Sequence, residues 1–320
     1  MQTITPADAK NVVVLVVPLL QAVMDALESE FTVRRLWEEA DRDAAFARWA
    51  DEAQAMVTFS DGRIDAAMMD ALPNVKIIAT MTVGFDHIDL AAARERRIQV
   101  THTPNVLTEA VADLAMALVL SVARQIVAAD RFVRSGEWSH RAMPPTRSVS
   151  GAHVGIVGLG RIGLAFARRA EAFDMHISYY GPRRKPDVRY PYYEDLRALA
   201  RDVDYLVITA PGGPDTHQMI NASVLDALGP DGALINVGRG SVVDEPALVS
   251  ALMTGTLGAA GLDVYAKEPD IPLELCGMDN VVLLPHIASA TGETRSAMGQ
   301  LVLDNLRAWF SGSPLVTPLS

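Results

Sequence analysis

Short apolar runs alternate with longer mixed segments along the first hundred residues of the chain. The apolar runs are rich in valine and isoleucine, which favour strands. The segments between them are rich in alanine, leucine, methionine and glutamate, which favour helices. The expected strands cover residues 12–17, 31–36, 55–59, 75–80 and 98–100. Strands that alternate with helices in this way are typical of a parallel sheet with helices on both faces.

A long alanine- and leucine-rich stretch, Asn105–Arg134, is apolar on much of its circumference and predicts one buried helical segment. Residues 135–151, rich in glycine, proline and serine, predict a connecting loop. Strand signals then recur at 153–158, 175–180, 203–210, 232–237, 258–264 and from Val281. Helices are expected between them, and a last helix at about 291–310 is expected to return to the first domain. The fold class is therefore α/β, with two doubly wound parallel-sheet domains.

Composition narrows the class of protein. The chain has 320 residues, enough for two domains, and its formal net charge of −11 argues against nucleic-acid or anionic-membrane partners. No apolar run reaches the ~18 residues that span a bilayer, and the run from Asn11 lacks the basic segment of a signal peptide. Cys276 is the only cysteine, which excludes an intrachain disulfide and a cysteine-based metal cluster. We predict a cytoplasmic protein without a metal site.

Three glycines, Gly158, Gly160 and Gly163, follow an expected strand in the spacing G-x-G-x-x-G. The spacing alone occurs by chance, but here a strand leads in and an amphipathic helix leads out. In a dinucleotide-binding turn the first glycine permits the bend and the second lets the pyrophosphate approach. The third lets helix and strand pack closely, and the helix N-terminus offers N–H groups to the phosphates. We predict a bound dinucleotide; a glycine-rich turn without a ligand is the alternative.

The residue after the second strand of such a domain normally meets the adenosine ribose, and an acid there favours NAD. This chain has Gly181 at that place, followed by the cations Arg183, Arg184 and Lys185. These side chains can surround a 2′-phosphate with charge-assisted hydrogen bonds. The prediction is NADP(H) in preference to NAD. A solvated loop with surface charge, or Asp187 as a displaced ribose partner for NAD, is the alternative.

A nicotinamide cofactor implies hydride transfer, and reduction of a carbonyl also needs a proton donor, such as histidine. His286 follows a strand that ends in proline, at the expected carboxyl edge of the sheet, where ligands of such folds bind. Two more strand ends deliver Arg239, which can bind a carboxylate, and Glu268, which can pair with His286. Taken one at a time, each residue has a simpler explanation. Arg239 could form a surface salt bridge, Glu268 could be a loop charge, and His286 could be a hydrogen-bonded polar residue at a strand end. His87 and His140, in polar loops, are expected at the surface.

Seven motifs in the same order carry a resemblance to a known family. They are VGFDHIDL, LTEAVADLAMALVL, GLGRIG, APGGPDTHQMI, NVGRGSVVDEPAL, GLDVYAKEP and LPHIASAT. Over nearly its whole length the chain resembles the D-isomer-specific 2-hydroxyacid dehydrogenases. The resemblance implies a Rossmann dinucleotide-binding domain, residues 104–287, inserted in a flavodoxin-like substrate-binding domain, residues 1–103 and 288–320. It also implies a homodimer packed through the helix and loop after Asn105.

The resemblance further implies roles for individual residues. His286 protonates the 2-oxo group of the substrate, Glu268 supports the charge of His286, and Arg239 binds the substrate carboxylate and polarises the carbonyl. Val83 and Gly84 offer backbone N–H donors to the same carboxylate. The family's remaining cofactor contacts fall here on Arg161, Ile162, Ala210, Val237 and Asp263, the last of which meets the nicotinamide carboxamide.

The segment YYGPRRKP, residues 179–186, departs from NAD-using members of the family and resembles its NADPH-preferring glyoxylate and hydroxypyruvate reductases. The prediction is therefore NADPH-dependent reduction of a small 2-oxo acid, glyoxylate or hydroxypyruvate, to the D-2-hydroxy acid. A bulkier 2-oxo acid, such as an arylpyruvate or a 2-ketoaldonate, is the alternative substrate. A formate dehydrogenase is a less favoured alternative within the family, because formate dehydrogenases lack the glutamate that is present here as Glu268. Dinucleotide-sensing corepressors can retain all three site residues, but a pure binding protein would show no turnover.

Overall fold

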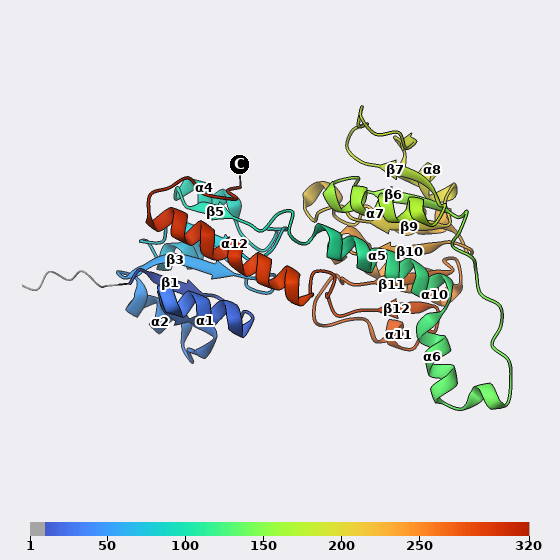
Figure 1. The fold of residues 1–320 in the computed structure, drawn as a ribbon, viewed down its shortest axis with the longest axis horizontal. Helices are drawn as coiled ribbons and strands as arrows, with labels where there is room; N and C mark the ends of the chain where they lie inside the picture. The colour runs from blue at the N-terminus through green and yellow to red at the C-terminus, as the bar shows by residue number, and fades with distance from the viewer. Residues whose placement is uncertain (1–9, 320) are drawn as a thin grey trace, which may run out of the picture. The chain divides into compact units, whose positions relative to one another are not determined.

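The structure is a computed structural model that describes residues 10–319. Contacts within the chain divide these residues into two units (Figure 1). Unit 1 comprises residues 10–106 and 292–319 of the described part, and unit 2 comprises Leu107–Thr291. The two breaks fall a few residues beyond the expected domain boundaries at 103 and 287. The chain thus leaves unit 1, forms unit 2 and returns.

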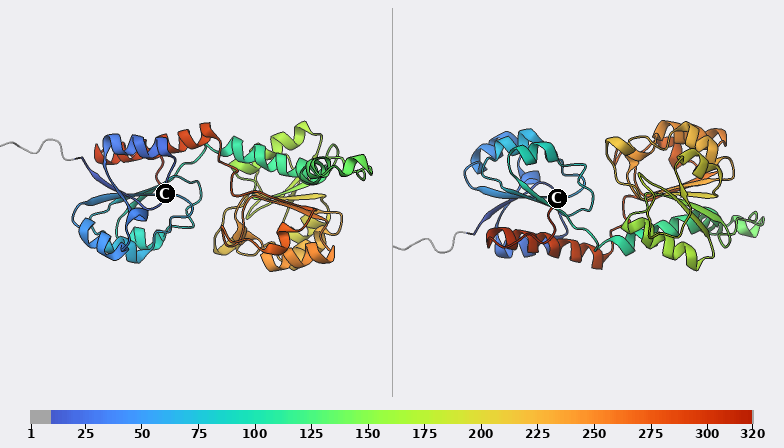
Figure 2. Two further views of the ribbon diagram at one scale, coloured as in Figure 1. Left: turned by 90° about the horizontal axis from the view of Figure 1, so that it is seen from below. Right: turned by 90° about the horizontal axis from the view of Figure 1, so that it is seen from above.

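Unit 1 is a five-stranded parallel sheet in the order β2-β1-β3-β4-β5. Its strands are β1 (Val12–Leu15), β2 (Thr32–Arg35), β3 (Ala53–Thr58), β4 (Ile77–Thr80) and β5 (Gln99–Thr101). Its helices are α1 (Gln21–Glu30), α2 (Arg42–Trp49), α3 (Ala66–Ala71), α4 (Leu90–Glu95) and α12 (Gly292–Phe310). Figure 2 shows α1 and α12 on one face of this sheet and α2 to α4 on the other. The strand order is that of flavodoxin-like folds.

Unit 2 is a seven-stranded parallel sheet in the order β12-β11-β10-β9-β6-β7-β8. Its strands are β6 (His153–Val157), β7 (His176–Tyr180), β8 (Tyr192–Tyr193), β9 (Tyr205–Ile208), β10 (Ala233–Asn236), β11 (Ala259–Leu262) and β12 (Val281–Leu283). Its helices are α5 (Thr108–Ala123), α6 (Ile126–Arg134), α7 (Arg161–Ala172), α8 (Leu196–Arg201), α9 (Ala222–Leu228), α10 (Glu245–Thr254) and α11 (Leu273–Cys276).

The order of β8, β7, β6, β9, β10 and β11 is that of a dinucleotide-binding sheet, whose direction of winding reverses between β6 and β9. Helices α5 and α7 cover one face of the sheet, and α8, α9 and α10 cover the other (Figure 2). The buried strands are nearly continuous in apolar residues, as expected for strands covered on both faces. The predicted fold class, two doubly wound parallel-sheet units with one inserted in the other, is confirmed.

The expectation of one long helical segment at Asn105–Arg134 is wrong. The structure has two helices, α5 and α6, bent by 59°. Gln125 between them adopts left-handed backbone angles, with φ 48°, and this interrupts the helical hydrogen-bond ladder without any glycine or proline. Among residues 10–319 no single helix is long and apolar enough to cross a membrane, and α5 and α6 pass that test only as a bent pair. Eight residues of α5 are buried within the structure.

Candidate active site

Three neighbouring strands of unit 2 deliver the predicted chemistry to one edge of the sheet. Arg239 follows β10, Glu268 lies beyond β11, and His286 lies three residues after the end of β12. Since β10, β11 and β12 are adjacent and parallel, their carboxyl ends meet at the same edge. Ligands of open α/β sheets bind at this edge.

Glu268 and His286 form a hydrogen-bonded acid–base pair. The distance from His286 Nδ1 to Glu268 Oε2 is 2.6 Å, and the two side chains are 28 % and 34 % exposed. The other carboxylate oxygen of Glu268 accepts the Tyr265 N–H at 3.0 Å. Burial acts to raise the pKa of Glu268, but His286, the Tyr265 N–H and the charge of Arg239 together hold that pKa below its usual value. Glu268 is therefore a carboxylate at neutral pH, and it leaves Nε2 of His286 for a ligand.

Arg239 is fixed by its own turn. The Asn236 side chain donates to the Arg239 carbonyl at 3.0 Å and accepts the Gly238 N–H at 3.0 Å, which closes the turn after β10. Arg239 Nη1 donates to the Gly238 carbonyl at 2.9 Å. The positive charge of Arg239 contributes to the lowered pKa of Glu268.

Asp263 holds the segment that carries His286. Its carboxylate is fully buried, and its two oxygens accept the N–H groups of Ile287 and Ala288, each at 2.8 Å. His286 itself has left-handed backbone angles, with φ 54°, so its conformation depends on such support. Burial raises the pKa of Asp263, against the lowering effect of the two N–H donors. The predicted contact of Asp263 with the nicotinamide carboxamide stays a prediction, beside this observed contact with the backbone.

Tyr265 supports the same segment from its other end. The Tyr265 hydroxyl donates to the Leu284 carbonyl at 2.9 Å, two residues before His286. Burial raises the pKa of Tyr265 to about 12, so this hydroxyl remains a donor throughout the neutral range. This role has no signature in the sequence, because the bond joins two segments that only the folded sheet brings together.

The glycine turn has the close approaches that its spacing predicts. Gly158 has φ +93°, and a Cβ there would lie 2.7 Å from the backbone of Ala210. A Cβ on Gly163 would lie 2.6 Å from the Gly158 carbonyl. At Gly160, by contrast, a Cβ would meet no protein atom within 4 Å. The turn is therefore closed toward β9 and open at Gly160, as a diphosphate would require.

The N-terminus of α7 continues this opening. Arg161 and Ile162 begin the helix, and no side chain caps it at Gly160. The N–H groups of a first helical turn have no partner within the helix and attract anions. The two other predicted groove positions are buried at the ends of neighbouring strands, Ala210 after β9 and Val237 after β10. These features fit a dinucleotide.

The basic loop, residues 181–188 after β7, carries three cations without counter-charges. Arg183 and Arg184 are exposed and Lys185 is half-buried. No ion pair joins any of the three to another residue within 10–319, including nearby Asp187. Arg189, just beyond the loop, differs because it pairs with Glu171 on α7.

Comparison with known proteins decides the family. The family model of the D-isomer specific 2-hydroxyacid dehydrogenase, NAD binding domain, matches residues 116–288. The hydroxyphenylpyruvate reductase of Plectranthus scutellarioides is 47 % identical over 307 residues, which cover 96 % of this chain and 98 % of that protein. The chain belongs to the D-isomer specific 2-hydroxyacid dehydrogenase family.

Other relatives of this dehydrogenase agree with the assignment. The glyoxylate/hydroxypyruvate reductase A of Arabidopsis thaliana is 45 % identical, over 96 % of this chain and 98 % of that protein. Among solved structures, the NADPH-dependent glyoxylate/hydroxypyruvate reductase of Sinorhizobium meliloti, in complex with NADP and malonate, superposes with a TM-score of 0.92. That protein is 42 % identical, and the match covers 97 % of each chain. The dehydrogenase is thus an oxidoreductase, and its unit 2 contains the NAD-binding domain.

In unit 1 of the dehydrogenase, Val83 and Gly84 lie in the loop after β4. The Val83 carbonyl lies 3.1 Å from His102 Nδ1, and the Gly84 carbonyl accepts the Thr82 hydroxyl at 2.5 Å. The N–H groups of Val83 and Gly84 have no hydrogen-bond partner within the part of the chain that the structure describes. The loop therefore presents two free donors, as a carboxylate ligand would require.

Two residues that hold this loop were missed from the sequence. His102 was assigned no role, yet it contacts the Val83 carbonyl. His87 was expected at the surface, but it is half-buried, with Nε2 3.0 Å from the Thr80 hydroxyl, which in turn lies 2.7 Å from Thr82 Oγ1. Neither contact has a sequence signature, because each depends on where the loop folds back.

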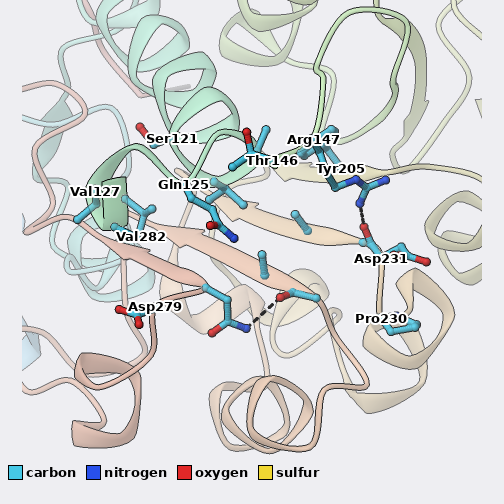
Figure 3. Close-up of a pocket in the computed structure, with 18 of the residues that line it drawn as sticks. Ser121, Gln125, Val127, Thr146, Arg147, Tyr205, Pro230, Asp231, Asp279 and Val282 are labelled. Atoms are coloured by element: carbon cyan, nitrogen blue, oxygen red, sulfur yellow. Dashed lines mark hydrogen bonds between the residues drawn. The ribbon is translucent and has the colours of Figure 1, made fainter. Parts of the chain in front are cut away.

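A separate hollow of about 190 Å³ lies at the opposite, amino edge of the unit 2 sheet (Figure 3). It is bordered by the first residues of β9, β10 and β11 and by the segment at Thr146 and Arg147. In Figure 3, the Arg147 side chain donates a hydrogen bond to the Asp231 carbonyl. The Asn280 side chain donates to the Gly258 carbonyl at 2.9 Å. The hollow holds none of the predicted site residues, so it does not bear on the proposed chemistry.

Proposed function

We propose that this dehydrogenase catalyses NADPH-dependent reduction of a small 2-oxo acid, of the glyoxylate or hydroxypyruvate type, to the D-2-hydroxy acid. The observation that carries the proposal is the 2.6 Å contact between Glu268 and His286 at the carboxyl edge of the cofactor sheet. A histidine held by a carboxylate, with its other ring nitrogen available, suits proton transfer to a carbonyl oxygen.

A bound reduced nicotinamide supplies the hydride that reduces the substrate carbon. The protein supplies the proton: Nε2 of protonated His286 donates to the carbonyl oxygen, while the Nδ1–H remains bonded to Glu268. As the ring loses its positive charge, Glu268 remains a carboxylate, because its pKa lies below the usual value. A second proton from solvent then restores the ring. One hydride and one proton convert the 2-oxo group to the alcohol.

Arg239 holds the substrate carboxylate. Within unit 1, we keep the free N–H groups of Val83 and Gly84 as predicted donors to a carboxylate. A guanidinium binds a carboxylate through two parallel hydrogen bonds and so fixes its orientation as well as its position. A positive charge near the carbonyl oxygen also stabilises the negative charge that develops there during hydride transfer. Arg239 therefore serves both binding and chemistry.

The glycine turn would hold the cofactor, with Gly160 and the first turn of α7 facing its diphosphate. Arg183, Arg184 and Lys185, whose charges no described acid neutralises, would bind the 2′-phosphate. The solved relative from Sinorhizobium meliloti, described as NADPH-dependent and bound to NADP, supports this choice of cofactor.

Steady-state turnover tests the proposal. The rates of NADPH oxidation with glyoxylate, hydroxypyruvate and 4-hydroxyphenylpyruvate should show kcat/KM highest for one of the two small acids. The product should be the D enantiomer by chiral chromatography. A higher kcat/KM for 4-hydroxyphenylpyruvate would favour the bulkier class, which the 47 % identity to a hydroxyphenylpyruvate reductase makes the second candidate. The absence of turnover with any 2-oxo acid would favour a dinucleotide-sensing binding protein.

We further propose a homodimer that packs through the arm, residues 126–146, which extends from the body of unit 2 (Figure 1). Ile126, Val127, Val133 and Trp138 in this arm are 45 to 68 % exposed. Light scattering should give twice the chain mass for the wild type and for Met253→Asp, a control at an exposed apolar residue outside the arm. Val133→Asp should shift the protein toward a monomer. An unchanged dimer would show that the surface around Val133 is not part of the dimer interface.

A further inference from the structure

Two tyrosine hydroxyls hold the basic loop. The Tyr179 hydroxyl accepts the backbone N–H of Lys185 at 2.8 Å. The Tyr192 hydroxyl donates to the carbonyl of Gly181, the first residue of the loop, at 3.0 Å. The two bonds therefore lie on either side of the segment that carries Arg183 and Arg184.

The tyrosines are themselves firmly placed. Tyr179 lies on β7 and is 1 % exposed, and Tyr192 lies on the neighbouring edge strand β8. Their ring centroids are 5.2 Å apart, with a tilt of 47° between the rings. Tyr179 is buried and Tyr192 is half-buried against it. Aromatic rings packed in this way have few alternative rotamers, so the two hydroxyls are well positioned to hold the loop.

The loop has little other support. Within residues 182–188, all of which the structure describes, the backbone makes one further hydrogen bond, from Val188 N–H to Lys185 O at 3.4 Å. Just past the loop, Glu171 on α7 binds Arg189 and also accepts the Tyr190 hydroxyl, at 2.8 Å. These contacts tie down the end of the segment but leave its centre, Arg183 to Lys185, dependent on the two tyrosines.

We propose that Tyr179 and Tyr192 are positioning residues that set NADPH specificity, by holding the basic loop in the form that presents its cations to the 2′-phosphate. This inference rests on the proposed function. Fixing a loop in its bound conformation lowers the cost of ordering it when the ligand binds. The resulting gain in affinity applies only to a ligand that contacts the loop. It should therefore be present for NADPH, which carries the 2′-phosphate, and absent for NADH.

The test compares kcat/KM for NADPH and NADH in wild type, Tyr179→Phe and Tyr192→Phe. Each variant keeps the ring and removes one hydroxyl. The matched control is Tyr193→Phe: its hydroxyl donates to Asp202 at 2.9 Å, from the same short strand as Tyr192, and makes no contact with the loop. We expect each of the first two variants to lower the NADPH-to-NADH ratio roughly two- to tenfold, the range of one hydrogen bond. The constants for NADH, and the ratio in the control, should not change.

Inhibition by adenosine 2′,5′-bisphosphate and by 5′-AMP gives the same comparison without chemistry. Only the bisphosphate should bind more weakly to Tyr179→Phe and Tyr192→Phe. When Tyr179→Phe is added to Arg183→Ala/Arg184→Ala/Lys185→Ala, the ratio should fall no further, because all three cationic side chains that the loop presents are already gone.

The outcomes separate the two proposals. Equal losses for both cofactors, or a ratio unchanged from wild type, would overturn the positioning role and leave the proposed function intact. The positioning role would also be overturned if Tyr179→Phe lowered the ratio as much in the variant without the three cations as it does in the wild type. A wild type without any NADPH preference would overturn the NADPH part of the proposed function, and the positioning role with it.

Discussion

Two charged regions of unit 2 differ in how their charges are compensated. At the carboxyl ends of β10 to β12, His286 has Glu268 as its partner, and Glu268 also accepts a backbone N–H and responds to the charge of Arg239. In the basic loop after β7, Arg183, Arg184 and Lys185 have no acidic partner within the described chain. A compensated group retains its protonation state and geometry, whereas uncompensated cations favour an added anion. The first arrangement suits proton transfer and the second suits phosphate binding.

Removal of the proton donor should have the largest effect. We expect His286→Ala to lower kcat for hydroxypyruvate by roughly 10³-fold, within the range of general acid catalysis. NADPH affinity, followed by fluorescence titration, should stay near the wild-type value. His153→Ala is a matched control, because His153 is an exposed histidine that begins β6 at the opposite edge of the same sheet. Near-normal turnover of His286→Ala would end the assignment of the proton donor.

Removal of the Arg239 guanidinium should have the second-largest effect on activity. Arg239→Ala should lower kcat/KM for hydroxypyruvate by roughly 10²-fold, because a charge-assisted pair of hydrogen bonds is lost. Arg239→Lys keeps the charge but not the planar fork, so it should recover only part of the loss. If kcat/KM is unchanged in Arg239→Ala, the carboxylate is held elsewhere.

The acid–base pair also predicts a pH effect. The pKa of Glu268 lies below its usual value, so Glu268 loses its charge only when pH falls through that lowered pKa. The rate of reduction should therefore fall on the acid side, as Glu268 is protonated. Glu268→Gln removes the carboxylate charge at every pH, so it should lower kcat/KM for hydroxypyruvate at neutral pH by roughly tenfold, the range of a hydrogen bond to a charged group. It should also abolish this acid limb of the pH profile.

Glu245→Gln is the control for the effect of Glu268→Gln. Glu245 accepts the Ala266 N–H at 3.0 Å, in the same segment as Glu268, but it has no contact with His286. Its pH profile should match that of the wild type. An unchanged kcat/KM in Glu268→Gln, with the acid limb still in place, would show that the 2.6 Å contact does not support the proton donor.

The fold was predictable because its signals are local and repeated. Valine- and isoleucine-rich runs marked the sheets, and the glycine spacing marked the turn before α7. The break at Gln125 was not predictable, since a non-glycine residue with left-handed angles has no strong sequence signal. The two-residue strand β8 was also missed, because it is defined only by pairing with β7.

The side chains of the candidate site were predictable from the sequence, but the contacts that support them were not. Arg239, Glu268 and His286 each follow a strand, and adjacent parallel strands bring their ends together. The supporting bonds were not predictable: Tyr265 to Leu284, His102 to Val83, and Tyr179 to Lys185 each join a side chain to the backbone of a segment positioned by tertiary folding. Such contacts leave no spacing or composition pattern in the sequence.

We expect the uncompensated cations of the basic loop to select the cofactor, and the compensated pair of Glu268 and His286 to perform the chemistry. The most direct measurement is kcat/KM for NADPH and for NADH, with saturating hydroxypyruvate, in wild type and in Arg183→Ala/Arg184→Ala. Arg189→Ala serves as the matched control, because Arg189 is a nearby cation already paired with Glu171. We predict a wild-type preference for NADPH of roughly 100-fold, or about 2.7 kcal/mol. This preference should be lost in the double variant, with NADH turnover unchanged, and kept in the control. A wild type that prefers NADH, or a double variant that keeps its NADPH preference, would contradict the claim.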